Sequence, residues 1–231
     1  MDFISIPQKV YSCYKTGEII ESDDCFPAGF SIVKKYPVVY AENLPRFKVV
    51  PRAYGHPFAE KPEKLYLGPD REGMGAYVKN IRRKRTKEEN ERLAGLQTFD
   101  EEGSCVITSE DDALFLLGLS LDSDDFEIIH TKVAGSDDIY PDDYRFLGYD
   151  ICYKVDCEGG FSIIGDCMFI CRWHGCDEEG TLFLEDFEKL NENGLFGSWD
   201  DAYRYMVKYL NQDWSERGNY AIYEVRGKNT D

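Results

Sequence analysis

In the second half of the chain, the spacing of the apolar residues changes from helical to strand-like and then back to helical. This pattern restricts the possible fold more than any other feature of the sequence. In residues 126–131, side chains alternate with the period of two that is typical of a strand with one partly apolar face. Residues 146–155, 161–164 and 167–173 are further strand-like runs, separated by short turns or by an acidic loop. Because consecutive strands with short connections pair in opposite directions, these runs predict an antiparallel meander.

Two helices are expected before this meander. Thr86 is followed three residues later by Glu89, which is the spacing of a capping box, so a helix is predicted from Thr86 to about Gly95. Ser109 is a good N-cap, and the three acidic residues after it suit the positive end of a helix dipole. The run that follows, residues 113–121, is apolar on nearly all sides. It is therefore predicted to be the buried central helix of the core.

Two more helices are expected after the meander. Phe183, Phe187 and Leu190 lie at helical spacing and are followed by an Asn-Gly stop signal. Ser198 is expected to cap a last helix with one apolar stripe, which consists of Ala202, Tyr205, Met206, Tyr209 and Leu210.

The chain has enough apolar material for one packed core. Of its 231 residues, 42% are hydrophobic and 14% are aromatic, which argues against disorder despite the high net charge. Short strand-like runs at 30–33, 38–40 and 47–50 are punctuated by prolines. The predicted fold class is therefore α+β, with a mainly antiparallel sheet packed with about four helices. A single domain over residues 1–231 is expected, and residues 97–108 are the candidate sub-boundary because charge and pattern both change there.

The charge is concentrated in the second part of the chain. Residues 1–100 carry 17 Lys and Arg against 14 Asp and Glu, a net charge of +3. Residues 101–231 carry 10 against 30, a net charge of −20. This asymmetry predicts a basic protein partner and argues against nucleic acid or an anionic membrane. The basic run at 79–85 is accordingly interpreted as a solvated entry to a helix.

The sequence also indicates the compartment. No apolar run approaches the roughly 20 residues that span a bilayer, and the start has no basic segment followed by a long apolar one. The eight cysteines are interpreted as reduced thiols, because a core of this size needs no disulfides. A cytoplasmic protein is expected.

A group of cysteines with one histidine raises the question of chemistry. Cys167, Cys171, His174 and Cys176 offer zinc ligands, but Cys167 and Cys171 would lie roughly 13 Å apart along a strand. Neither a metal nor another cofactor is therefore predicted. His174 beside Cys176 keeps one alternative open, in which this loop serves a hydrolase that acts on a small molecule or a peptide.

The acidic residues divide into two kinds. Pairs at 111–112 and 200–201 have a sufficient role in the first turns of helices. Acids in loops are free to meet a partner, and the predicted partner-binding residues are Asp137, Asp138, Asp142, Asp143, Glu178 and Glu179. The spaced pattern of a calcium loop is absent.

The last third of the chain resembles small acidic bacterial proteins that serve as immunity partners of polymorphic toxins. The residues that carry the resemblance are 147–150 (Leu-Gly-Tyr-Asp), Ser162, 190–196 and the helix with 199–205. The resemblance implies a cytoplasmic protein that neutralises a toxin by binding it. We therefore expect a non-enzymatic inhibitor without catalytic residues. A mimic of DNA charge is a third class, and it would need regularly spaced surface carboxylates.

Overall fold

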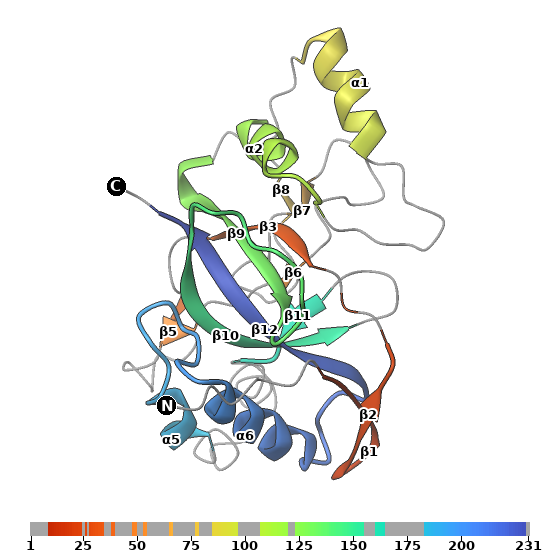
Figure 1. Cartoon of the computed structure of the whole chain (residues 1–231), viewed down its shortest axis with the longest axis vertical. Helices are drawn as coiled ribbons and strands as arrows, with labels where there is room; N and C mark the ends of the chain where they lie inside the picture. Colours follow the sequence, from red (N-terminus) through yellow and green to blue (C-terminus); the bar gives the residue numbers. More distant parts are fainter. Residues whose placement is uncertain are drawn as a thin grey trace.

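The structure is a computed structural model of the whole chain (Figure 1). It describes residues 9–24, 26, 28–34, 38–39, 48–49, 53–54, 65–66, 77–78, 85–96, 107–119, 123–154, 160–164 and 183–229. The strand predicted at 167–173 and most of the candidate sub-boundary at 97–108 lie outside these residues. Their assignments remain predictions, as does the single domain.

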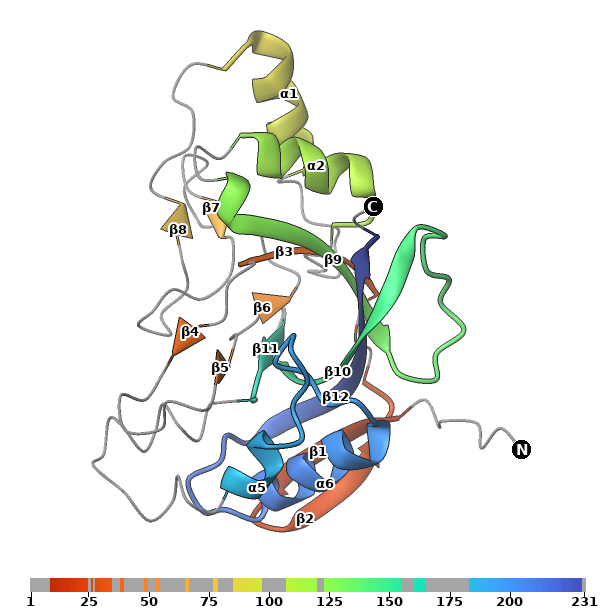
Figure 2. The ribbon, with the colours of Figure 1, turned by 90° about the vertical axis from the view of Figure 1, so that its left-hand side faces the viewer.

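An antiparallel sheet of eight strands forms the centre of the fold (Figures 1 and 2). Its strands are β1 (Val10–Lys15), β2 (Glu18–Ser22), β3 (Gly29–Lys34), β6 (Ala53–Tyr54), β9 (Phe126–Val133), β10 (Tyr144–Lys154), β11 (Gly160–Ser162) and β12 (Gly218–Lys228). Two small two-stranded sheets pair β4 (Val38–Val39) with β5 (Lys48–Val49) and β7 (Leu65–Tyr66) with β8 (Tyr77–Val78). Four α-helices and one short 3-10 helix, η1 (Ser123–Asp125), complete the described part. The predicted fold class is confirmed.

Strand β12 has neighbours on both edges. One edge pairs with β10 over most of the strand. The other edge is shared, because residues 218–221 pair with β1 and residues 223–227 pair with β9. The sheet therefore divides into two arms, β1–β2 and β9–β3, that meet on one strand.

Helix α6 (Trp199–Leu210) covers one end of the sheet, where β1 joins it (Figure 1). Its N-cap is Ser198, whose hydroxyl accepts a hydrogen bond from the Asp201 amide at 3.2 Å. All five residues of the predicted stripe are buried, and they pack against Tyr11, Ile151, Tyr220 and Ile222 of the sheet. The prediction for this helix is confirmed, and α6 builds the largest apolar cluster among the described residues.

Helix α2 (Glu110–Gly118) covers the opposite end of the sheet. Its predicted Ser109 cap is confirmed, since the Asp112 amide donates to the Ser109 hydroxyl at 3.1 Å. The helix buries Ala113 and Leu116 against the sheet but leaves Leu114 48% exposed. The prediction of a helix buried on all sides was therefore wrong. Only one face of α2 meets the sheet, because the helix lies at the margin of the fold.

The other two helices are short or peripheral. Helix α1 (Lys87–Leu96) begins with the predicted capping box, in which the Thr86 amide donates to Glu89 at 2.7 Å and the Glu89 amide donates back at 3.1 Å. Helix α5 (Leu184–Phe187) has only four residues. The helical spacing does not extend to Leu190, which instead bridges to Phe196 as part of a turn.

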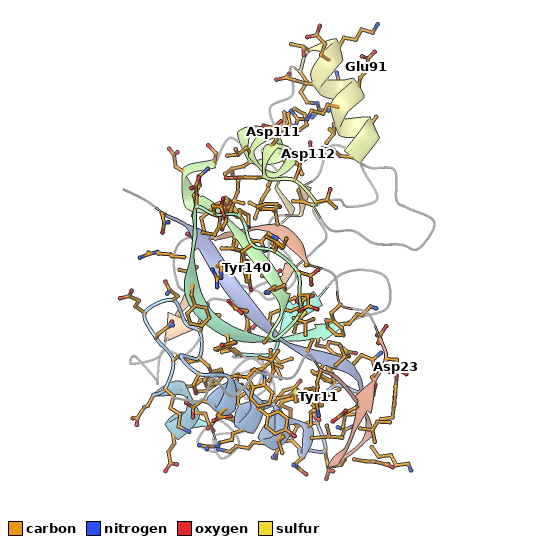
Figure 3. All side chains as sticks on the ribbon, in the orientation of Figure 1. Tyr11, Asp23, Glu91, Asp111, Asp112 and Tyr140 are labelled. Atoms are coloured by element: carbon orange, nitrogen blue, oxygen red, sulfur yellow. The ribbon has the colours of Figure 1, made fainter. Side chains whose placement is uncertain are left out.

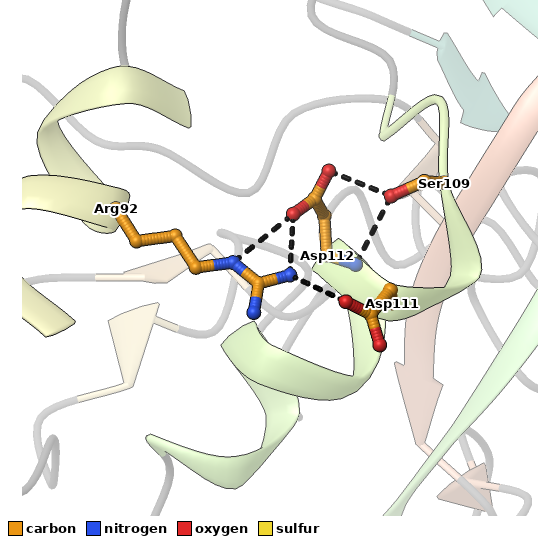
Figure 4. A network of polar contacts seen from close by, with 4 residues as sticks. All are labelled: Arg92, Ser109, Asp111 and Asp112. Atoms are coloured by element: carbon orange, nitrogen blue, oxygen red, sulfur yellow. Dashed lines mark hydrogen bonds and ion pairs between the residues drawn. The ribbon is translucent and has the colours of Figure 1, made fainter. Parts of the chain in front are cut away.

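Arg92 joins α1 to α2 across a small polar network (Figure 4). Its guanidinium lies 2.7 Å from Asp112 and 3.2 Å from Asp111. The hydrogen bond from Ser109 and the guanidinium of Arg92 lower the pKa of Asp112 below its usual range. These two acids are therefore balanced within the chain.

Gly148 marks a close approach between the sheet and the turn at 191–197. The Tyr149 amide donates to the carbonyl of Phe196 at 2.8 Å, which brings this turn alongside β10. Gly148 has a φ of +148°, and a Cβ there would lie 2.6 Å from the Cβ of Leu195. Only glycine fits without a shift of backbone.

We expect Gly148→Ala to lower the free energy of unfolding by about 2–4 kcal/mol, because it adds backbone strain and overpacking. Urea unfolding followed by circular dichroism measures the change. Gly197→Ala is the matched control, since a Cβ at Gly197 meets nothing within 4 Å. Equal effects of the two substitutions would contradict the close approach at Gly148.

Candidate functional site

The loop that joins β9 to β10, residues 134–143, carries four of the six predicted site residues, and we name it the acidic loop. Asp137, Asp138, Asp142 and Asp143 are all exposed there. Figure 2 shows the loop, in green, bulging away from the sheet at a height between α2 and α6. The structure thus groups these four acids on one surface. Glu178 and Glu179, together with the alternative site at 174–176, lie outside the described residues.

A strip of polar side chains crosses the sheet beneath this loop. Cross-strand pairing places Lys132 opposite Glu224, and His130 opposite Arg226. Because side chains alternate along a strand, these four share the face of β12 on which Ile222 packs against α6. The strip therefore separates the apolar cluster under α2 from the apolar cluster under α6.

Lys132 fastens the first part of the acidic loop to the sheet. Only 9% of this residue is exposed. Its ammonium donates to the carbonyls of Ser136 and Asp138, at 2.8 Å each. The same nitrogen lies 4.6 Å from the centre of the Tyr140 ring. A buried ammonium needs such partners, since leaving it without them would be strongly destabilising.

Tyr140 fastens the second part of the loop. Its ring lies under the guanidinium of Arg226, whose Cζ is 4.0 Å from the ring centre, and its hydroxyl donates to the Glu224 carbonyl at 3.1 Å. The Glu224 carboxylate holds Arg226 in place at 2.9 Å. Figure 3 shows Tyr140 over the middle of the sheet, between α2 and α6. Burial raises the pKa of the Tyr140 hydroxyl well above its ordinary value, so the ring stays neutral.

The parts of the loop that are not fastened face outward. Ile139 is 88% exposed, although it lies between two anchored residues. Asp138 accepts a hydrogen bond from the Ser136 hydroxyl at 2.7 Å, which orients that carboxylate. Among the described side chains, Asp137, Asp142 and Asp143 have no ion-pair partner. The acidic loop therefore presents carboxylates and one apolar side chain from a backbone held by cations.

His130 lies at the edge of this arrangement and is 6% exposed. Its ring makes edge-on contacts with Phe30 at 4.8 Å and with Tyr140 at 5.2 Å. Its Nδ1 atom has no hydrogen-bond partner among the described residues. Burial lowers the pKa of His130 from 6.5 to about 4, and the nearby Lys132 and Arg226 act in the same direction. The imidazole is therefore neutral at pH 7.

Two cysteines and one histidine lie among the described residues. Within them, no three His, Cys, Asp or Glu side chains gather in a way that would hold a metal ion. Cys13 and Cys152 are buried free thiols, as the sequence predicts, and burial raises the pKa of the Cys152 thiol. Such a thiol is a poor nucleophile because little of it is ionised near neutral pH.

Sequence reasoning identified the acids but missed Lys132, Ile139, Tyr140 and Arg226. A signal for two of them was present, since residues 139–141 are an Ile-Tyr-Pro segment inside an acidic loop. Arg226 could not be found in this way, because it reaches the loop through a strand register that joins residues about ninety positions apart. Lys132 lies only a few residues before its partners Ser136 and Asp138, but no local pattern marks a lysine on a strand as buried.

Comparison with known proteins gives no further indication of function. No protein-family model, no curated protein and no solved structure matches the chain. Across the part of the chain that the structure describes, no helix is long and apolar enough to span a membrane.

The depressed pKa of His130 makes stability depend on pH. The unfolded chain binds this proton near pH 6.5 and the folded chain only near pH 4, so stability falls as the pH drops through that window. Between about pH 7.5 and about pH 5, the imidazole contributes a loss of roughly 2 kcal/mol.

His130→Phe keeps the edge-on ring contacts and removes the titration. We expect the loss in free energy of unfolding over this range to be smaller by about 2 kcal/mol in the variant than in the parent chain. Urea unfolding at both pH values measures the difference, and all other titrating groups are common to the two chains. Parallel pH profiles would show that His130 is protonated as readily in the folded chain as in the unfolded one.

Proposed function

We propose that the protein is a non-enzymatic inhibitor of the immunity type, which binds a basic toxin or effector domain through the acidic loop. The observation that carries this proposal is the arrangement of the loop itself. Four exposed carboxylates stand on a backbone that Lys132 and Tyr140 hold to the sheet. A preformed surface loses less conformational entropy on binding than a flexible one.

The direction of the charges supports the same function. The acids of α2 are balanced by Arg92 and Lys228, which pairs with Glu110 at 2.5 Å. Lys132 and Arg226 point into the fold beneath the loop, whereas the loop carboxylates point outward. The acidic loop therefore presents its negative charge to solvent. A field of this sign attracts a basic protein and speeds its docking.

An inhibitor of this kind acts by occlusion. Enzymes that cut nucleic acid need a basic surface to bind their substrate. An acidic loop on that surface occupies the place of the phosphates and repels the substrate. An inhibitor of this kind needs no reacting group of its own.

Neutralising the loop tests the proposal. The four-fold variant Asp137→Asn, Asp138→Asn, Asp142→Asn and Asp143→Asn keeps side-chain shape and removes the charge. The binding probe is the product of the gene next to this chain's gene, which the proposal expects to carry the toxin domain. We expect its association rate to fall about 10-fold or more at low salt, and its dependence on salt to flatten. Surface plasmon resonance between about 0.02 and 0.5 M NaCl measures both quantities.

The control variant carries the same loss of charge elsewhere. It replaces four other exposed acids by glutamine: Glu88, Glu188, Glu192 and Glu216. We expect this variant to associate within about 3-fold of the parent chain, since its acids lie outside the loop. Equal effects of the two variants would show that the loop acids act only as part of the general negative charge of the protein. No binding of the parent chain to the toxin domain would refute the inhibitor function.

A further inference from the structure

We propose that Ile139 is the anchor of the binding surface and enters an apolar pocket bordered by Lys and Arg on the basic partner. We further propose that Lys132, Tyr140 and Arg226 are positioning residues that set this side chain before the partner arrives. The inference rests on the proposed function and specifies how its surface works. It adds an apolar contact to the electrostatic attraction, and it names the residues that hold the apolar side chain in place.

The exposure of Ile139 is unusual within the described part of the chain. Five large hydrophobic residues are exposed there, and the other four range from 42% to 65%, whereas Ile139 reaches 88%. An apolar side chain surrounded by charged ones is the arrangement of a binding hot spot, in which a dry contact is ringed by polar groups. Carboxylates on this side call for cationic groups around the pocket on the other. Nucleic acid does not suit the site, since its phosphates share the sign of the loop acids.

The anchoring of the neighbours explains why Ile139 faces outward. The carbonyl of Asp138 is bound to the Lys132 ammonium, and the ring of Tyr140 is bound to the guanidinium of Arg226. With both neighbours drawn toward the sheet, the residue between them is directed to solvent. The stabilising contacts are therefore made by residues 138 and 140, and residue 139 stays exposed.

Two cations over one tyrosine make the ring central to this arrangement. Lys132 and Arg226 come from different strands, and both lie within 5 Å of the ring centre. Cation–π contacts are strongest where the cation is withdrawn from water, as Lys132 is. Removing the ring leaves both cations without their shared partner and loosens the loop. Removing only the hydroxyl leaves the cation contacts in place.

The first experiment measures the order of the loop without any partner. Tyr140→Leu removes the aromatic ring, and Tyr140→Phe is the matched control that loses only the hydrogen bond to Glu224. Hydrogen exchange of peptides covering residues 134–144 reports the amides of Ser136 and Tyr144, which donate to the carbonyls of Val133 and Pro141 at the two ends of the loop. We expect exchange at least about 10-fold faster in Tyr140→Leu and within about 3-fold of the parent in Tyr140→Phe.

An internal control excludes general destabilisation. The turn at residues 211–217 is held by Arg217, away from Tyr140, and its exchange should be unchanged. Lys132→Met is a second variant that removes the two carbonyl contacts as well, and it should also loosen residues 134–144. Equal protection of the loop in Tyr140→Leu and Tyr140→Phe would overturn the positioning role of the ring.

The second experiment measures binding to the same neighbouring gene product, which the proposed function expects to be the toxin. Ile139→Ala should weaken the dissociation constant about 10- to 100-fold, mainly through faster dissociation, since buried anchors govern the lifetime of a complex. Leu114→Ala is the control, because Leu114 is an exposed apolar residue on α2, outside the loop. Its binding should match that of the parent chain.

The outcomes separate the two proposals. If the parent chain binds and Ile139→Ala binds equally well, the anchor is refuted while the inhibitor function stands. If the parent chain does not bind, the inhibitor function and the anchor both fail. The exchange measurement still decides in that case whether Tyr140 orders the loop.

Discussion

Strand β12 is the constraint on which the described structure depends. Successive residues on one of its faces serve three different regions of the fold. Ile222 packs under α6, Glu224 and Arg226 hold the acidic loop, and Lys228 pairs with Glu110 at the start of α2. Because strand side chains alternate, one register of β12 against β9 and β10 fixes all three positions. A slip by one residue would turn each of these groups to the opposite face.

The same register determines which charged side chains around the acidic loop point into the fold and which point to solvent. Lys132 and Arg226 point inward and are satisfied by carbonyls, a carboxylate and an aromatic ring. The acids of the loop point outward into water. The net charge of −17 is thus less informative than its placement. A buried Lys132 and a partly buried Arg226 hold a backbone whose surface is acidic, so the residues that order the loop differ from those that would attract the proposed partner.

Local signals in the sequence predicted the elements that depend on neighbouring residues. The capping box at Thr86, the caps at Ser109 and Ser198 and the stripe of α6 all act within a few residues, and each is confirmed. The β1–β2 hairpin was missed, although its two-residue turn contains Gly17 at a φ of +72°. The burial of α2 was overestimated because apolar composition does not tell how many sides a helix buries. The contacts of Tyr140 with Glu224 and Arg226 depend on strand register between distant segments, which no local pattern encodes.

The central claim is that the acidic loop is the surface that meets the partner. The most direct test is a hydrogen-exchange footprint of the full chain in complex with the product of the neighbouring gene, which the proposal expects to be the toxin partner. The account predicts that binding slows exchange in residues 134–146 and leaves α6 and the β1–β2 hairpin unchanged. Protection confined to the β1–β2 hairpin, or to residues 165–182, with the acidic loop unaffected, would contradict it.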